Sequence, residues 1–335
     1  MTLPAALAAV VDLQHAHRDL LRVVDALKPD DWSRGVPYGE WTVKDLVAHC
    51  IGDMSPSGPG LIAAGVLSPQ FIEETSAAFD VRSRNQQVVE ERRRYTPEDL
   101  RQLLFEAHDA RIEATLRLNE SHAAVLAYPV PMGPNYEIQV VDWLWYSYHD
   151  RQHAADINRA LETEWQPQSF TFVPEIEEKM PFMVRAHDGL LRAVYSADNG
   201  TWAESSALPG WSYHDVLAHL SSNEARRRSR LLSAILNGEN VEELEGINDI
   251  DGWNDERVRE RRDWPVRQLV DELVLGWHEI RVTLSDFRAE HLDRSVTLGG
   301  GRSMLVREFL GRMSEHTSTH AGQLVPASRA RRDHH

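Results

Sequence analysis

Hydrophobic residues along the chain recur with the spacing of amphipathic helices. In long segments they return every three or four positions, which places them on one face of an α-helix. In the first half this pattern predicts helices at 5–28, 42–55, 97–119 and 138–162, with a further helical stretch near 70–93. In the second half it predicts helices at 177–198, 212–236, 265–290 and 302–325, with helical turns near 241–262. No strand pattern recurs at the spacing of βαβ units, so we expect an all-α fold.

The helical pattern lapses once in the middle of the chain. The lapse covers 163–176, which we interpret as a linker between a first domain at 1–162 and a second at 177–328. A chain of 335 residues is long enough for two ordinary domains. Two shorter segments, 127–138 and 295–303, are expected to form a hairpin or an irregular loop before the last helix of each domain.

The two halves of the chain resemble each other. The segment AHRDLLRVVDAL (16–27) is similar to AHDGLLRAVYSA (186–197), and EWTVKDLVAHC (40–50) is similar to GWSYHDVLAHL (210–220), both at an offset of 170 residues. Self-similarity at a fixed offset indicates a duplicated unit. Each copy carries four main helices, so we predict two tandem four-helix bundles.

The duplication also repeats a set of histidines. Each copy has one histidine followed about 100 residues later by a His-x-x-x-His pair. The members are His49, His149 and His153 in copy one, and His219, His316 and His320 in copy two. With 16 histidines in 335 residues, chance alone predicts about one such pair. Two pairs at matching positions, each preceded by a matching third histidine, show shared origin and retention, although not a role.

This arrangement suits a metal site. Residues at i and i+4 lie on one face of a helix, so the two imidazoles of a pair can bind one ion. His49 and His219 each lie two turns into a helix whose start is marked by Thr42 or Ser212, and they can supply a third ligand. Three protein ligands leave a position open for water, thiol or substrate. The alternative is a set of packed core histidines that make hydrogen bonds.

Other duplicated residues are expected to have structural roles. Asp45 and Asp215 follow Thr42 and Ser212 by three residues and are expected to cap helices. Four duplicated tryptophans are expected to pack the bundles, namely Trp32, Trp41, Trp202 and Trp211. Four duplicated histidines without a partner at ligand spacing are interpreted as core or surface residues, namely His17, His108, His187 and His278.

The surroundings of the predicted sites differ between the copies. Trp145 lies one turn before His149 and could form an aromatic wall beside the ion, whereas copy two has Arg312 at that place. No general base can be assigned, and the weak candidates are Asp53, Glu224 and Glu315. Cys50 adjoins His49 but points about 100° away around the helix, so it is not expected to be a ligand.

Composition limits the partners. The formal net charge of −16 argues against a nucleic-acid partner, which requires clustered Lys and Arg. No apolar run approaches the roughly 18 residues needed to cross a bilayer. The N-terminal segment lacks a basic leader and is interpreted as a first helix, not a signal peptide. With Cys50 as the single cysteine, the chain can form no internal disulfide, and a cytoplasmic protein fits best.

The motifs WTVKDLVAH (41–49) and WSYHDVLAH (211–219), each followed by a distal His-x-x-x-His, resemble the DinB-like superfamily. They are most similar to its branch that includes mycothiol-dependent maleylpyruvate isomerase. The resemblance covers nearly the whole chain and implies two tandem DinB-like four-helix bundles, each holding one divalent ion, zinc or nickel among others. Carried over residue by residue, the metal ligands are His49, His149 and His153, then His219, His316 and His320.

The resemblance favours a metal-dependent enzyme that acts on a small molecule. It would activate a low-molecular-weight thiol, mycothiol- or bacillithiol-like, for S-transfer to, or isomerisation of, an electrophile. The isomerase would place Glu at the first position of the distal pair, where both copies have His, so the isomerase activity itself transfers less readily. The alternatives are a metal-dependent hydrolase and a non-catalytic metal-binding protein that sequesters a reactive compound under stress.

Two further expectations concern the copies themselves. Because members of the family often dimerise, the two bundles are expected to pack together as an internal pseudo-dimer. Copy one is expected to be the active copy because of its aromatic wall near Trp145.

Overall fold

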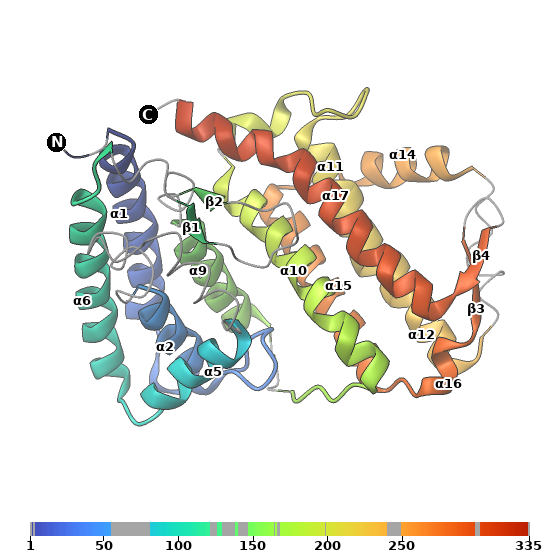
Figure 1. The fold of residues 1–335 in the computed structure, drawn as a ribbon, viewed down its shortest axis with the longest axis horizontal. Coiled ribbons are helices and arrows are strands. Elements are labelled where there is room, and N and C mark those ends of the chain that lie inside the picture. Colours follow the sequence, from blue (N-terminus) through green and yellow to red (C-terminus); the bar gives the residue numbers. More distant parts are fainter. Residues whose placement is uncertain are drawn as a thin grey trace. The chain divides into compact units, whose positions relative to one another are not determined.

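A computed structural model describes most of the chain in two compact units, Met1–Gln168 and Ser169–His335. The described residues are 2, 4–54, 81–120, 126–128, 138–139, 147–163, 165, 168–197, 199–239, 249–298 and 302–333. Helices dominate both units (Figure 1), as the hydrophobic pattern predicts. Among the described residues, none of the helices combines the length and the apolar character that a membrane crossing requires.

Unit 1 is a four-helix bundle with short additions. Its main helices are α1 (Pro4–Asp25), α2 (Val43–Met54), α6 (Pro97–Leu116) and α9 (Ser147–Glu162). The additions are the 3₁₀ helix η1 (Pro29–Ser33), α5 (Val81–Arg92) and the antiparallel strands β1 (Leu126–Tyr128) and β2 (Ile138–Gln139). Helix α1 packs against α9 and α6, and α2 packs against α6 and α9, which closes the bundle.

Unit 2 repeats this plan with a longer and interrupted second helix. Its main elements are α10 (Pro174–Ser196), α11 (Tyr213–Ser222), the π-helical segment η3 (Asn223–Arg228), α12 (Ser229–Asn237), α15 (Val266–Ser285) and α17 (Val306–Asp333). The shorter ones are η2 (Asn199–Ala203), α14 (Ile250–Arg261), α16 (Ala289–Leu292) and the hairpin of β3 (Ser295–Leu298) with β4 (Arg302–Leu305). Helix α10 packs along α17, while α11 and α12 pack against α15.

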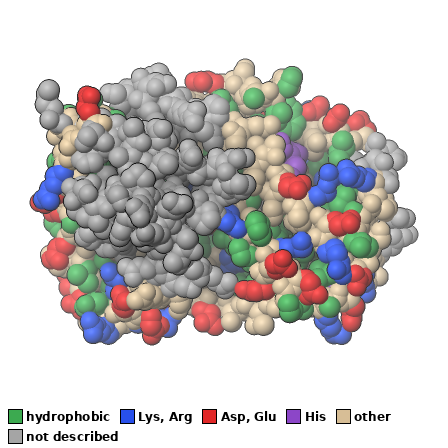
Figure 2. All heavy atoms as spheres, viewed as in Figure 1, with side chains coloured by type: hydrophobic (Ala, Val, Ile, Leu, Met, Phe, Trp, Pro, Cys, Tyr) green, Lys and Arg blue, Asp and Glu red, His purple; other side chains and the backbone are tan. Residues whose placement is uncertain are grey.

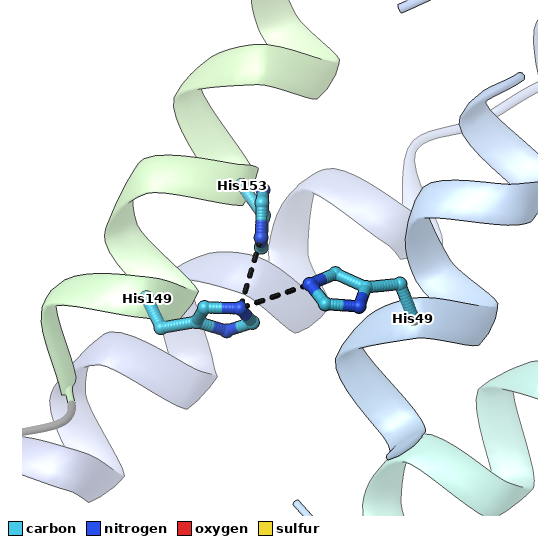
Figure 3. A group of neighbouring side chains, drawn as sticks. All are labelled: His49, His149 and His153. Atoms are coloured by element: carbon cyan, nitrogen blue, oxygen red, sulfur yellow. Dashed lines mark hydrogen bonds between the residues drawn. The ribbon is translucent and has the colours of Figure 1, made fainter. Parts of the chain in front are cut away.

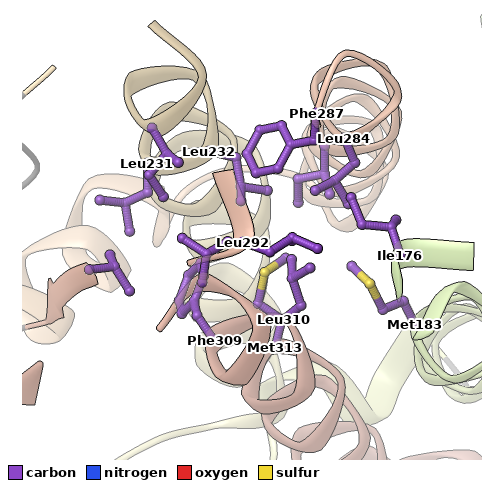
Figure 4. Close-up of a cluster of buried hydrophobic side chains, with 14 of the residues drawn as sticks. Ile176, Met183, Leu231, Leu232, Leu284, Phe287, Leu292, Phe309, Leu310 and Met313 are labelled. Carbon is purple, nitrogen blue, oxygen red and sulfur yellow. The ribbon is translucent and has the colours of Figure 1, made fainter. Parts of the chain in front are cut away.

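Each bundle encloses its own apolar core. In unit 1, Leu20, Leu46, Leu100 and Ile157 bring one fully buried side chain from each main helix into a single cluster. Unit 2 has two clusters, and Figure 4 shows the one in which side chains of α10, α12, α15 and α17 converge. Burying one such side chain stabilises the fold by about 1.5–3 kcal/mol. These cores fix the helix positions on which the histidine sites depend.

The start of the second helix is built alike in both units. An antiparallel bridge joins Gly35 to Thr42 in unit 1 and Ser205 to Ser212 in unit 2. Each of these turns contains one glycine, Gly39 or Gly210, whose backbone φ is near +80°. Residues other than glycine rarely adopt this conformation. The turns deliver Thr42 and Ser212 to the first position before the helix, where capping takes place.

Asp45 and Asp215 cap these helices, as predicted. The backbone N–H of Thr42 donates to Asp45 Oδ2 at 3.0 Å, and that of Ser212 donates to Asp215 Oδ2 at 2.9 Å. In return, the backbone N–H groups of the two aspartates donate to the Thr42 and Ser212 hydroxyls at 3.3 and 3.1 Å. These reciprocal bonds satisfy amides that a helix start otherwise leaves unpaired.

Most helices lie where the sequence analysis predicts them, and two predictions were wrong in part. Residues 138–139, expected to begin the last helix of copy one, form strand β2, and helix is described only from Ser147. The helix expected at 212–236 is interrupted by the π-helical turn η3. Hairpins are present near both expected segments, as β1–β2 and β3–β4. Of the helix expected at 70–93, positions 70–80 lie outside the described residues, and the described part is α5.

Charged side chains are mixed on the surface. On the described part of the face drawn in Figure 2, acidic and basic side chains lie interspersed with apolar ones. Some of these charges form local ion pairs, such as Arg93 with Glu90 and Arg257 with Glu260.

Candidate metal centres

The three predicted histidines of unit 1 come together inside the bundle. His49 on α2 and His149 and His153 on α9 point their rings toward one another (Figure 3). The Nε2 atom of His149 lies 3.1 Å from Nε2 of His49 and 3.0 Å from Nε2 of His153. All three side chains are buried. The i, i+4 pair on one helix and the third histidine on a facing helix therefore meet as the spacing predicts.

A carboxylate holds one of these rings in place. His153 Nδ1 donates to Asp156 Oδ2 at 3.1 Å, which leaves Nε2 with its lone pair facing the other histidines. Asp156 is fully enclosed and also accepts from Tyr38 Oη at 2.5 Å and Arg159 Nη1 at 2.6 Å. Burial raises the pKa of Asp156, but the bonds from His153 and Tyr38 and the charge of Arg159 outweigh it and lower that pKa overall.

Unit 2 brings its own three histidines together in the same way. Nε2 of His219 on α11 lies 3.3 Å from Nε2 of His316 on α17. One ligand atom from each of His219, His316 and His320 lies within 4.8 Å of the others. His320 Nδ1 donates to Gln323 Oε1 at 2.6 Å, so an amide stands where unit 1 has the carboxylate of Asp156. His316 and His320 are only half-buried.

The imidazoles of unit 2 are neutral near pH 7. Burial, together with the nearby charges of His320, Arg228 and Arg227, lowers the pKa of His219 to about 3. Burial and the charge of Arg228 lower the pKa of His316 to about 2. Burial also lowers the pKa of His320. Neutral imidazoles are the form that binds a metal ion.

The donor geometry fits a cation in both units. A neutral imidazole has one N–H and one lone pair, so three Nε2 atoms that face one another cannot all be satisfied by mutual hydrogen bonds. A divalent ion would take a lone pair from each ring, and tetrahedral zinc is commonly bound by three histidines. The triads, the first of His49, His149 and His153 and the second of His219, His316 and His320, could each hold one metal ion.

The triad of unit 2 opens onto a large pocket. The pocket has a volume of about 810 Å³ and is lined by all three histidines together with Trp211, Asn223 and Leu208. Four arginines also line it, namely Arg227, Arg228, Arg302 and Arg312, and so do three acidic residues, Asp251, Asp255 and Glu315. A volume of this size is typical of sites for small molecules. A guest can therefore reach the second triad.

Two of the four tryptophans do more than pack the core. Trp32 and Trp202 are buried in the cores, as predicted. Trp41 and Trp211 are half-buried and lie against the triads, each with its ring centroid 5.2 Å from that of His49 or His219. Trp211 also lines the pocket. The expectation of simple packing was thus incomplete for these two side chains.

The duplicated histidines outside the triads have structural surroundings. His17 and His108 are buried and stack at 3.5 Å, and His187 is buried against Trp277 at 5.1 Å. His278 contacts Phe170 edge to face at 6.0 Å. Burial lowers the pKa of His17 to about 3 and of His108 to about 4, so these rings are neutral near pH 7.

The remaining candidate neighbours of the two triads differ in where they lie. Trp145 and the side chains of Asp53 and Glu224 lie outside the described residues. Glu315 is exposed at the pocket of unit 2. Cys50 is buried in the apolar core of unit 1, away from the triad, as expected.

Sequence reasoning missed the residues that surround the triads. Asp156 and Gln323 each stand three positions after the last histidine of their copy, so the repeat itself contained the signal. Asn223 follows His219 by four positions, which is one α-helical turn, and its backbone N–H still donates to the carbonyl of His219. Arg228, at the end of η3, had no such signal.

Comparison with known proteins places the chain in a family. No curated protein and no solved structure matches it significantly. The family defined by the mycothiol maleylpyruvate isomerase N-terminal domain matches residues 13–158 and again residues 183–321. The two matches fall one in each unit, and the resemblance inferred from the motifs is confirmed. The chain therefore belongs to the mycothiol maleylpyruvate isomerase N-terminal domain family, a DinB-like family, and carries its domain twice.

Proposed function

We propose that the chain is a metal-dependent enzyme that activates a low-molecular-weight thiol for reaction with a small electrophile. The observation that carries this proposal is the convergence of three neutral imidazoles at the wall of a pocket of about 810 Å³ in unit 2. A buried triad alone would suit a structural ion. A triad that a guest can reach suits catalysis, because one coordination position stays available.

The residues of unit 2 have separable tasks in this proposal. His219, His316 and His320 hold a divalent ion, which when bound supplies Lewis acidity that lowers the pKa of a thiol. Gln323 orients the ring of His320 through its 2.6 Å hydrogen bond. Trp211 forms an aromatic wall next to His219, and the pocket arginines favour a guest that carries negative charge.

The reaction class follows from the thiol. Addition of a thiol to an activated double bond forms one C–S bond and one C–H bond and releases no by-product. If both of these bonds break again after rotation about the former double bond, the thiol is regenerated and the electrophile is isomerised. The family includes an isomerase that uses mycothiol, which supports the thiol route over hydrolysis.

Metal analysis of the purified full chain is the first test. We expect about two divalent ions per chain, falling to nearly none in the double variant His149→Ala/His316→Ala. The matched control is His15→Ala/His214→Ala, which removes one histidine per unit outside the triads and should leave metal content unchanged. An unchanged metal content in the triad variant would refute the site assignment.

A thiol-conjugation screen on the zinc-loaded chain is the second test. Turnover that requires both the ion and a thiol supports the proposal. Turnover with water alone would replace it with a hydrolase. A loaded protein that binds thiols without turnover would indicate a metal-binding protein that sequesters its ligand.

A further inference from the structure

Asn223 stands at the point where helix α11 gives way to the π-helical segment η3. It follows His219 by one helical turn, and its side chain is buried. Its amide Nδ2 lies 3.2 Å from Nε2 of His219, the nitrogen that also lies 3.3 Å from Nε2 of His316. π-Helical turns inside α-helices occur frequently at functional sites.

A neighbouring arginine fixes which way this amide faces. Arg227 Nη1 donates to Oδ1 of Asn223 at 3.4 Å. A guanidinium can only donate hydrogen bonds, so the amide atom facing Arg227 must be the oxygen. The NH₂ group consequently faces the triad. This orientation follows from the chemistry of the partner.

An NH₂ group cannot bind a cation, because it offers only donors. In the structure it donates to the lone pair of His219 Nε2, and an ion held by the triad would use that same lone pair. The Nδ2–H then requires a different acceptor in a site where an unpaired buried donor is costly. The pocket that contains Asn223 and the triad supplies space for such an acceptor.

We propose that Asn223 binds the guest of the second triad, by donating a hydrogen bond from Nδ2 to an anion held there, such as a thiolate. This inference rests on the metal-dependent function proposed above. The hydrogen bond from Asn223 makes unit 2 selective for guests that keep a lone pair after binding to the ion. Arg227 acts indirectly, as the residue that positions the amide.

The feature belongs to copy two alone. At the offset of 170 residues that relates His49 to His219, the counterpart of Asn223 is Asp53. A carboxylate has no N–H to donate and repels an anion, so the same hydrogen bond cannot form in copy one. The sequence thus has an amide at this position in copy two and a carboxylic acid at the matching position in copy one.

The test uses the full chain carrying His149→Ala, so that only the second triad binds metal, loaded with Co²⁺. Azide and imidazole are titrated separately, and binding is followed by the visible absorption of the ion. Azide keeps lone pairs once bound, whereas imidazole has none left at its binding nitrogen. Asn223→Leu and Asn223→Ala should weaken azide binding by about tenfold, the usual effect of one hydrogen bond to a charged group. Both should leave imidazole binding and Co²⁺ affinity within about twofold.

A second variant guards against a general loss of structure. Arg227→Met keeps Asn223 in place but removes the bond that orients it, and it should weaken azide binding in the same direction by a smaller factor. Unchanged azide affinity in both Asn223 variants would overturn the inference. So would a changed cobalt spectrum before azide is added, because that result would make Asn223 a ligand of the ion.

Failure of the underlying function gives a different result. If the parent chain with His149→Ala binds cobalt but neither azide nor imidazole, the second triad has no open position. That outcome overturns both the proposed function and the role of Asn223. Azide binding that is tight and insensitive to residue 223 overturns only the latter.

Discussion

The two triads share their ligands but differ in what surrounds them. In unit 1 the ring of His153 is held by the buried carboxylate of Asp156, which Tyr38 and Arg159 also contact. In unit 2 the corresponding partner of His320 is the amide of Gln323, and Leu208 stands where unit 1 has Tyr38. The first triad is fully buried, and the second lines a pocket of about 810 Å³.

This difference shows what a duplicated bundle preserves and what it changes. Helix spacing and caps determine where the histidines meet, and both are repeated in the two units. Accessibility, charge and hydrogen bonding depend on neighbouring residues, and these have diverged. Function resides in such site details and not in the fold. We therefore propose the reactive role for the second triad, whereas the sequence analysis favoured copy one because of Trp145.

The largest expected effect comes from removing one metal ligand at a time. His149→Ala should remove the ion of unit 1 alone, and His316→Ala that of unit 2 alone, so each variant should retain about one ion per chain. Elemental analysis of the purified variants measures this directly. Loss of both ions in either single variant would show that the two sites depend on each other, contrary to two separate centres.

A matched pair of core substitutions tests whether the units are equivalent in stability. Leu20 and Leu190 occupy corresponding positions, and both are fully buried. Replacing either with alanine should cost about 2–5 kcal/mol of unfolding free energy in its own unit, through lost burial and the cavity left behind. Hydrogen exchange read by mass spectrometry reports which unit loses protection. A cost below about 1 kcal/mol would show that one of these leucines is not a core residue.

The fold was predictable because its causes are local and repeated. Apolar periodicity, the Thr42 and Ser212 caps and the duplicated histidines are all visible in sequence, and they were sufficient to place the bundles and to bring the triads together. Strand β2 was missed because Ile138 and Gln139 are strand only through their pairing with β1, and nothing in their own pattern distinguishes a strand from a helix start.

The pocket was not predictable for a related reason. It is lined in part by Asn223, Arg227 and Arg228, which belong to the π-helical segment η3. A π-turn changes the helical register by one residue and leaves the hydrophobic pattern nearly intact, so periodicity cannot locate it. Asp156 and Gln323 were within reach of sequence reasoning, because both follow their histidine by three positions.

The hydrogen bonds behind the triads allow a finer comparison of the two sites. A carboxylate bonded to a metal-binding histidine fixes its ring and increases its basicity, and removing such a partner typically weakens metal binding by about 10–100-fold. Asp156→Asn should therefore weaken binding at unit 1 by a factor in this range, whereas Gln323→Ala should have a smaller effect at unit 2. The measurement is competition with a zinc chelator, each variant being made in a chain whose other triad carries a His→Ala substitution. Equal losses in the two units would contradict the distinction between carboxylate and amide.

The smallest expected effect concerns the helix caps, where the units should behave alike. Thr42→Ala and Ser212→Ala each remove the hydroxyl that accepts from the aspartate N–H, at a typical cost of about 1 kcal/mol. Unit 1 has an additional contact, from Arg93 Nε to Asp45 Oδ1 at 3.4 Å, but the Arg93 side chain is 44% exposed. Exposed ion pairs contribute little, so this contact should not compensate for the lost cap. Urea unfolding of the two variants should give costs equal within about 0.5 kcal/mol, and a much smaller cost for Thr42→Ala would show that Arg93 holds the first turn of α2 by itself.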